Sequence, residues 1–83
     1  MRYIKDIANP EFKIGLYQWN NKYIIKVESG MYEQTYKLDA YEVENSDEVE
    51  VCMDPQFLTA VRENFERMQS AFFDSLKRNN VVF

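Results

Sequence analysis

Histidine is absent from this chain of 83 residues, which also has only one cysteine, two glycines and two prolines. Without histidine, a serine or cysteine nucleophile lacks its usual general base. Two glycines are too few for a glycine-rich loop that cradles a phosphate, and no GxxxxGK[ST] sequence is present. We therefore expect a protein that is not an enzyme, with no catalytic residues and no cofactor.

The lone cysteine and the lack of long apolar runs indicate the cellular compartment in which we expect the protein. Cys52 cannot form an internal disulfide, which is typical of a reducing compartment, and we expect it to be a small side chain of the core. No apolar run approaches the roughly 18 residues of a membrane span, and residues 1–6 are too charged for a signal peptide. The sequence therefore predicts a cytoplasmic protein with no membrane segment.

Positive charge is also in short supply. The chain has 10 basic and 14 acidic residues and a formal charge of −4, so nucleic acid is a disfavoured partner. The acidic residues are densest over residues 42–54, but this segment lacks the spacing and the glycine of an EF-hand. We expect it to be a solvated connector without a metal site.

Aromatic residues, by contrast, are abundant, and residues 12–38 predict three antiparallel strands joined by two short turns. Asn20 and Asn21 suit a type I′ turn because asparagine tolerates positive φ angles. This turn places Tyr17 opposite Ile24. A slip of one residue would scatter the apolar side chains over both faces of the sheet, so the pattern predicts the register.

The second turn is predicted at Ser29-Gly30, with glycine at the position of positive φ. It pairs Val27 with Tyr32 and Lys26 with Glu33. The strands then have an apolar face, face A, and a mixed face, face B. Face A comprises Phe12, Ile14, Leu16, Tyr23, Ile25, Val27, Tyr32, Tyr36 and Leu38. Face B comprises Tyr17, Trp19, Ile24, Met31 and Thr35, among charged residues that include Lys13, Lys22, Lys26 and Lys37.

A long helix is predicted from Asp54 to about Arg78. Asp54 is a favourable N-cap, Pro55 suits the first helical position, and Asn79-Asn80 ends the helix. Apolar residues recur at helical spacing and form a stripe. The stripe comprises Phe57, Val61, Phe65, Met68, Phe72 and Leu76.

Two segments remain open. Residues 39–53 alternate like edge strands, yet Ser46 could equally begin a helical turn. The lead-in that ends at Asn9-Pro10 is compatible with a strand or a turn.

Together these patterns predict one α+β domain over residues 1–83. We expect an antiparallel β-meander of three to four strands, followed by one long C-terminal α-helix packed on one sheet face. A helix of about 36 Å would outrun strands of about 23–27 Å, and a single helix leaves face B open.

These two mismatches predict an interaction surface and a homodimer that buries it. The surface comprises Tyr17, Trp19, Ile24, Phe72, Phe73 and Leu76, with the apolar terminus Val81-Val82-Phe83 beside it. The alternative is that the lead-in or residues 39–53 fold over face B.

The stretch "RYIKDIANPEFKIGLYQWNNKYIIKVESGMYEQTYKL", followed by "FLTAVRENFERM", resembles a short uncharacterised Bacteroidetes-type bacterial protein family of unknown function. The resemblance covers most of the chain, and "YEQTYK" and "FLTAVRENF" are its most distinctive parts. It implies a cytoplasmic protein. It brings no activity, cofactor or catalytic residue to any position of this sequence.

The order of elements, antiparallel strands and then a C-terminal helix, is also similar to the PUR-alpha and Whirly group of single-stranded nucleic-acid binders. That similarity implies a dimer in which bases stack on exposed sheet aromatics, a role for Tyr17 and Trp19. Our leading prediction is a small non-enzymatic interaction or structural protein that self-associates or binds a protein partner. A single-stranded nucleic-acid-binding module on face B is the alternative.

Overall fold

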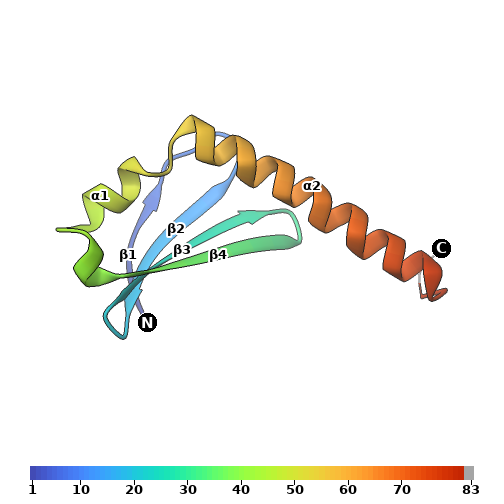
Figure 1. Ribbon diagram of the computed structural model, residues 1–83, viewed down its shortest axis with the longest axis horizontal. Helices are drawn as coiled ribbons and strands as arrows, with labels where there is room; N and C mark the ends of the chain where they lie inside the picture. The colour runs from blue at the N-terminus through green and yellow to red at the C-terminus, as the bar shows by residue number, and fades with distance from the viewer. Residues whose placement is uncertain (82–83) are drawn as a thin grey trace.

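The computed structural model describes residues 1–81 and confirms the predicted α+β arrangement (Figure 1). A four-stranded antiparallel sheet, in the order β1-β2-β3-β4, is followed by helices that lie on one side of it. The elements are β1 (Arg2–Ile7), β2 (Lys13–Trp19), β3 (Lys22–Ser29), β4 (Tyr32–Asp39), the 3-10 helix η1 (Ala40–Glu42), α1 (Ser46–Val51) and α2 (Pro55–Arg78).

The β2–β3 hairpin has the predicted turn and register. Asn20 and Asn21 have φ angles of 54° and 60°, as a type I′ turn requires, and Tyr17 lies opposite Ile24. Four apolar residues of the two strands consequently fall on face A, where the core forms: Ile14, Leu16, Ile25 and Val27.

The β3–β4 turn lies one residue later than predicted, at Gly30-Met31. Gly30 has a φ of 60°, and a glycine at the first position of a two-residue loop is typical of a type II′ turn. Ser29 therefore pairs with Tyr32, and the predicted pairing of Val27 with Tyr32 is wrong.

The predicted pairing of Lys26 with Glu33 is wrong for the same reason, because Lys26 lies opposite Thr35. The shift is two residues along β4. Side chains alternate between faces with a period of two, so the residues of β4 keep their predicted faces. Met31 is the exception: it belongs to the turn rather than to face B, and it is 98% exposed.

Neither segment left open by the sequence covers face B. The lead-in forms β1, which pairs with β2 at the edge of the sheet. Within residues 39–53, Asp39 ends β4 and the rest contains the short helices η1 and α1 rather than further strands. The Asn45 side chain caps α1 by accepting bonds from the backbone N–H groups of Asp47 and Glu48. The Val49 side chain of α1 packs into the core on face A. The alternative to the predicted dimer, in which one of these segments folds over face B, therefore does not apply.

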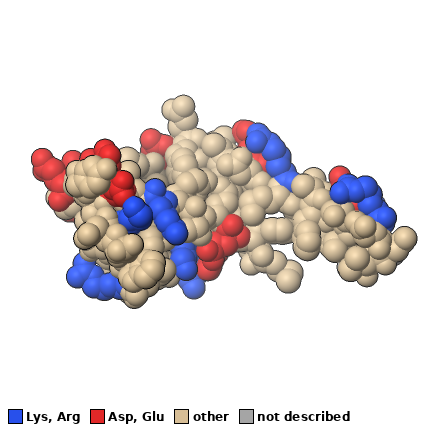
Figure 2. Space-filling view, turned by 60° about the horizontal axis from the view of Figure 1, so that its bottom comes forward, with Lys and Arg blue, Asp and Glu red and all other residues tan. Residues whose placement is uncertain are grey.

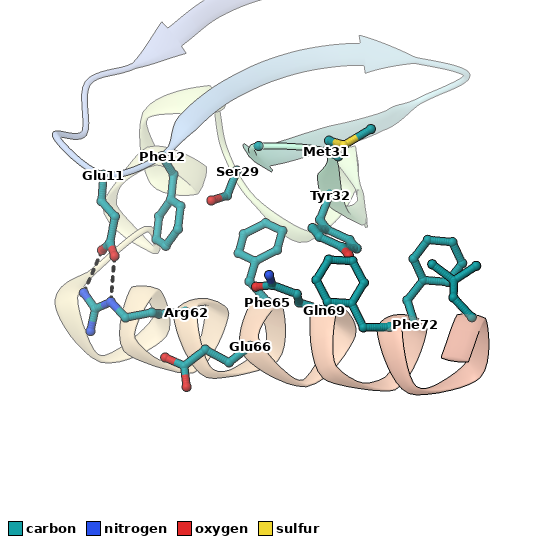
Figure 3. Close-up of a pocket in the computed structure, with 13 residues that line it drawn as sticks. Glu11, Phe12, Ser29, Met31, Tyr32, Arg62, Phe65, Glu66, Gln69 and Phe72 are labelled. Atoms are coloured by element: carbon teal, nitrogen blue, oxygen red, sulfur yellow. Dashed lines mark hydrogen bonds and ion pairs between the residues drawn. The ribbon is translucent and has the colours of Figure 1, made fainter. Parts of the chain in front are cut away.

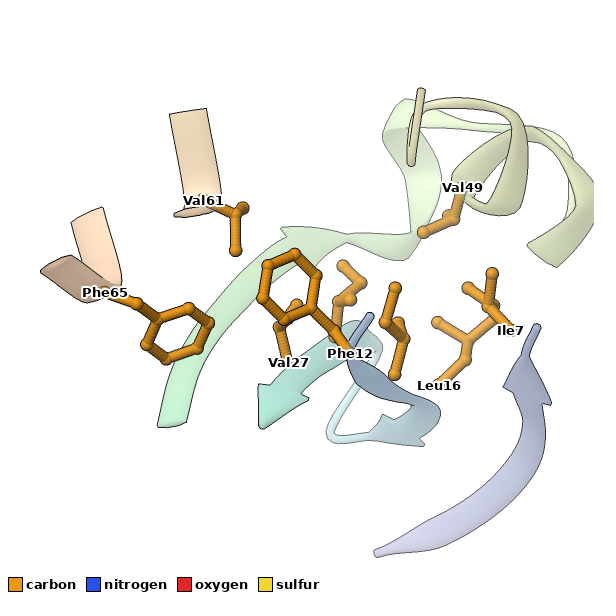
Figure 4. Packing of buried hydrophobic residues seen from close by; sticks show 9 residues of the cluster. Ile7, Phe12, Leu16, Val27, Val49, Val61 and Phe65 are labelled. Carbon is orange, nitrogen blue, oxygen red and sulfur yellow. The ribbon is translucent and has the colours of Figure 1, made fainter. Parts of the chain in front are cut away.

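The core lies between face A and the two helices (Figure 4). Its buried residues are Ile7, Phe12, Ile14, Leu16, Ile25, Val27, Val49, Val61 and Phe65. Cys52, which we expected in this core, is exposed, because it follows the last turn of α1 on the outer side of the molecule.

Helix α2 begins and ends where the sequence predicts. The Asp54 side chain accepts a bond from the Phe57 backbone N–H at 2.8 Å, and Asn79 forms the C-cap. Its buried residues, Val61 and Phe65, both lie in its N-terminal half. Met68 is the last residue of α2 that packs against the core. Residues 69–78, which we call the overhang, follow it, and Figure 1 shows this end of α2 extending past the sheet. The molecule consequently measures 48 × 27 × 18 Å.

Candidate functional site

A groove of about 700 Å³ lies between the β3–β4 turn and α2, on the side of the helix that faces the sheet (Figure 3). Phe12, Met31 and Tyr32 line it from the sheet. From α2 come Arg62, Phe65, Glu66, Gln69, Phe72, Phe73 and Leu76. We call this cavity the α2 groove.

The apolar part of the α2 groove exists because the helix stripe continues after the sheet has ended. Phe65 is buried, and its ring packs against Phe12 with centroids 5.5 Å apart. Two turns later, Phe72 is 54% exposed and Phe73 40% exposed. The same stripe thus changes from core to surface within about 10 Å of helix.

An ion pair closes the opposite end of the groove. The Arg62 guanidinium donates from Nε and Nη2 to the two carboxylate oxygens of Glu11, at 2.8 and 2.7 Å. This bidentate contact holds the pKa of Glu11 below its usual value and raises the pKa of Arg62. Because both groups are engaged with each other, the pair fixes the β1–β2 connection to α2 and offers no activated acid or base.

The predicted interaction surface divides into two separate parts. Phe72, Phe73 and Leu76 all line the α2 groove. Tyr17, Trp19 and Ile24 lie on face B, the face of the sheet opposite the core. The structure does not bring the two sets together. Val82 and Phe83, expected to extend the apolar surface, lie outside the described residues, whereas Val81 is 65% exposed.

Ile24, which we predicted as part of the interaction surface, is only 2% exposed. It lies in the middle of face B, between Tyr17 on β2 and Lys37 on β4, with Lys22 and Lys26 two residues away on its own strand. Long side chains of this kind cover an apolar neighbour with their stems while their polar ends reach water. Face B is therefore less apolar than its sequence pattern implies.

The Tyr17 ring is held by its neighbours on face B. It lies over Gly15, where a Cβ atom would come within 2.9 Å of Tyr17 Cε1. The Tyr3 ring meets it edge-on at 5.7 Å, and the Lys26 ammonium lies 5.3 Å from its centroid. Trp19, at the end of β2, is 57% exposed and is the more accessible ring.

The charges of face B balance across the described strands. Four lysines share the face with four carboxylates, namely Asp6, Glu28, Glu33 and Asp39. Lys22 contacts Asp39 at 2.5 Å, which raises the pKa of the lysine and lowers that of the aspartate, and Lys13 lies 4.0 Å from Glu28. Figure 2 shows basic and acidic side chains near one another over the sheet and acidic ones gathered at the α1 end.

Sequence reasoning missed the sheet side of the α2 groove. Phe12 and Tyr32 were assigned to the core and Met31 to face B, yet all three line the groove. The signal for Met31 was present, since glycine at the first position of a type II′ turn favours a Gly30-Met31 loop. Nothing in the local pattern indicated that this turn would lie beside α2.

The chain matches no protein-family model, no curated protein and no solved structure. The resemblance to a Bacteroidetes-type family, the similarity to the PUR-alpha and Whirly group and the cytoplasmic location therefore stay predictions. Within residues 1–81, no helix combines the length and apolar character needed to cross a membrane. The same residues contain no group of three or more cysteine, aspartate or glutamate side chains placed to hold a metal ion.

Proposed function

We propose that the protein is a non-enzymatic interaction protein that acts by forming a homodimer through the α2 groove and the overhang. The observation that carries this proposal is the continuation of the apolar stripe beyond the sheet, where Phe72, Phe73 and Leu76 line an open groove instead of a closed core. Apolar side chains arranged contiguously around a groove are typical of an interaction site, whereas single exposed ones are not.

The shape of the chain supports an association. Its radius of gyration is 15.2 Å, against about 12 Å for a compact domain of this length. The excess comes from the overhang. The backbone hydrogen bonds of the overhang are not enough to stabilise it as a helix, because most helical stability in proteins comes from packing of the apolar face. A second copy of the chain would supply that packing for residues 69–78.

Face B is a weaker candidate for the interface. Its central apolar residue, Ile24, is already covered, and its lysines are matched by carboxylates. This balance also argues against single-stranded nucleic acid as the ligand of face B, because such binders present a positively charged groove beside their stacking aromatics. We therefore prefer self-association to the nucleic-acid alternative.

The number of residues that line the groove indicates the affinity expected of the dimer. Thirteen residues line it, whereas a standard protein interface uses about 20–30 residues on each side. We expect a dimer with an affinity in the micromolar range rather than a permanent one.

Sedimentation equilibrium over micromolar concentrations tests the proposal. The parent chain should show the mass of two chains at the upper concentrations. The double variant Phe72→Asp, Phe73→Asp should show the mass of one chain throughout, because it introduces two carboxylates into the apolar interface.

Trp19→Asp is the matched control, since it replaces another exposed aromatic residue with the same acid on face B. It should keep the parental affinity. Loss of the dimer in this variant but not in the helix variant would assign the interface to face B. A parent that has the mass of one chain at all concentrations would contradict self-association.

A further inference from the structure

One side of α2 carries a row of side chains that is complementary to the same row on a second, antiparallel copy of the helix. Glu66, Ser70, Phe73 and Lys77 follow one another at spacings of four, three and four residues, so they form a row along a single side of the helix. All four are exposed. Ser70, Phe73 and Lys77 line a common surface depression, which confirms that the row is continuous toward the C-terminal end.

We infer that two copies of the chain pair their overhangs antiparallel along this row, an inference that rests on the proposed dimer. The spacing of four, three and four residues is the same when the row is followed from either end, so two antiparallel rows match position by position. In the antiparallel pair, Glu66 of each copy faces Lys77 of the other, and Phe73 of each copy lies over Ser70 of the other. Opposite charges meet at both ends, and a large side chain meets a small one on either side of the centre.

Two further charge pairs of α2 suit this orientation. In the register that pairs Glu66 with Lys77, Arg78 of the second copy lies within two residues of the level of Glu63, and Asp74 within two residues of the level of Arg67. A parallel pairing in register would instead place each charged residue beside the identical residue of the second chain, so that like charges meet. The charge pattern therefore selects the antiparallel orientation.

The described ion pairs leave the two charged residues of this row, Glu66 and Lys77, available to a second copy. The described ion pairs of α2 join Arg62 to Glu11 and Arg67 to Glu63, and neither Glu66 nor Lys77 has an ion-pair contact within 4.0 Å among the described residues. Both side chains are exposed, so they can reach a second copy without breaking a contact that holds the fold.

The length of the overhang also fits an antiparallel pair. From Ala71 to Arg78 the helix advances about 10 Å, and from Ala71 back to Phe65 about 9 Å. In the antiparallel pair, the tip of each overhang thus ends near the level of Phe65 of the other copy, where the α2 groove meets the sheet. In the register that pairs Glu66 with Lys77, Arg78 of one copy comes level with Phe65 of the other. Each overhang thus lies along α2 of its partner beside the groove, and the contact closes after two chains, as an isologous interface requires.

Charge reversal tests the orientation and register. Glu66→Lys and Lys77→Glu should each weaken dimerisation by about tenfold, because each change turns two attractive contacts per dimer into repulsive ones. The double variant Glu66→Lys, Lys77→Glu should recover the parental affinity. An equimolar mixture of the two single variants should form mixed dimers.

The measurement is sedimentation equilibrium at low ionic strength with a reducing agent, which prevents crosslinking through the exposed Cys52. Lys37→Glu, a reversal on face B, is the control and should keep the parental affinity. Circular dichroism confirms that each variant is folded.

The possible outcomes distinguish this inference from the proposed dimer. If the parent dimerises and both single reversals keep its affinity, the antiparallel register is wrong while the dimer stands. If the single reversals weaken association and the double variant fails to restore it, the pairing of Glu66 with Lys77 is wrong. A monomeric parent would overturn both proposals.

Discussion

At the scale of single residues, the contact between Glu11 and Arg62 joins parts of the chain that are 51 positions apart. It fastens the β1–β2 connection to α2 beside the point where Phe12 and Phe65 pack together. Two parallel hydrogen bonds between a guanidinium and a carboxylate fix orientation as well as distance. The pair therefore holds α2 against the β1–β2 connection at one end of the α2 groove.

We predict that this pair makes the fold sensitive to acid. The pKa of Glu11 is lowered in the folded state, so the pair stabilises the fold above the ordinary glutamate pKa of about 4.3 and ceases to do so as the pH falls. Urea unfolding of the parent and of Glu11→Gln should give different free energies of unfolding at about pH 7, and this difference should shrink as the pH falls below the ordinary glutamate pKa. A difference that does not change with pH would show that the carboxylate charge does not stabilise the fold.

At the scale of elements, α2 consists of two halves in different surroundings. Its N-terminal half carries Val61 and Phe65 into the core, and Gln34 of β4 donates a hydrogen bond to the Val61 carbonyl oxygen at 2.9 Å. Its C-terminal half exposes Phe72 and Phe73. The apolar stripe runs through both halves of α2. A substitution in the first half should nevertheless change the free energy of unfolding more than one in the second half.

We predict that Phe65→Ala destabilises the monomer by about 3–5 kcal/mol, because removal of a buried ring leaves a cavity. Phe72→Ala should cost less than about 1 kcal/mol, since the side chain is more than half exposed. Thermal unfolding at low protein concentration, where the monomer dominates, compares the two. Equal losses would show that the overhang is packed against its own chain.

The β2–β3 hairpin supports a second prediction at this scale. Asn21 has a φ of 60°, which glycine adopts freely and a β-branched residue does not. Asn21→Gly should therefore be neutral or slightly stabilising, and Asn21→Val should lower the midpoint of thermal unfolding. A valine variant as stable as the parent would contradict the type I′ turn.

At the scale of the whole molecule, a sheet of four strands supports only the first half of its longest helix. The resulting elongated monomer keeps an apolar groove open at the junction of helix and sheet. A domain of this size buries about 60% of the surface of its unfolded chain, so stability gained by association is a considerable part of the total.

We predict that the thermal midpoint of the parent rises with protein concentration, because a dimer that forms only from folded chains shifts the unfolding equilibrium by mass action. The midpoint of the Phe72→Asp, Phe73→Asp variant should be independent of concentration. Differential scanning calorimetry over the micromolar range measures both. A concentration-dependent midpoint in the variant would place the interface elsewhere.

Local patterns sufficed for much of this fold. The β2–β3 register follows from two asparagines that accept positive φ angles, and the bounds of α2 follow from the Asp54 cap and Asn79. The overhang follows from helix and strand lengths alone. Three residues of the candidate site, Phe72, Phe73 and Leu76, were accessible to the same reasoning, because a stripe longer than its sheet must run past it.

Other features depended on contacts between segments that are distant in the sequence. The alternation in residues 39–53 fits a strand, yet the Asn45 cap and the packing of Val49 on face A produce a helical turn. Ile24 alternates outward, yet side chains from neighbouring strands bury it. The sequence by itself determined the β2–β3 hairpin and α2, because turn chemistry, capping and periodicity act within a few residues. Only the tertiary structure decided the α2 groove, since a groove requires Met31 and Phe72, from separate elements, to lie across the same space.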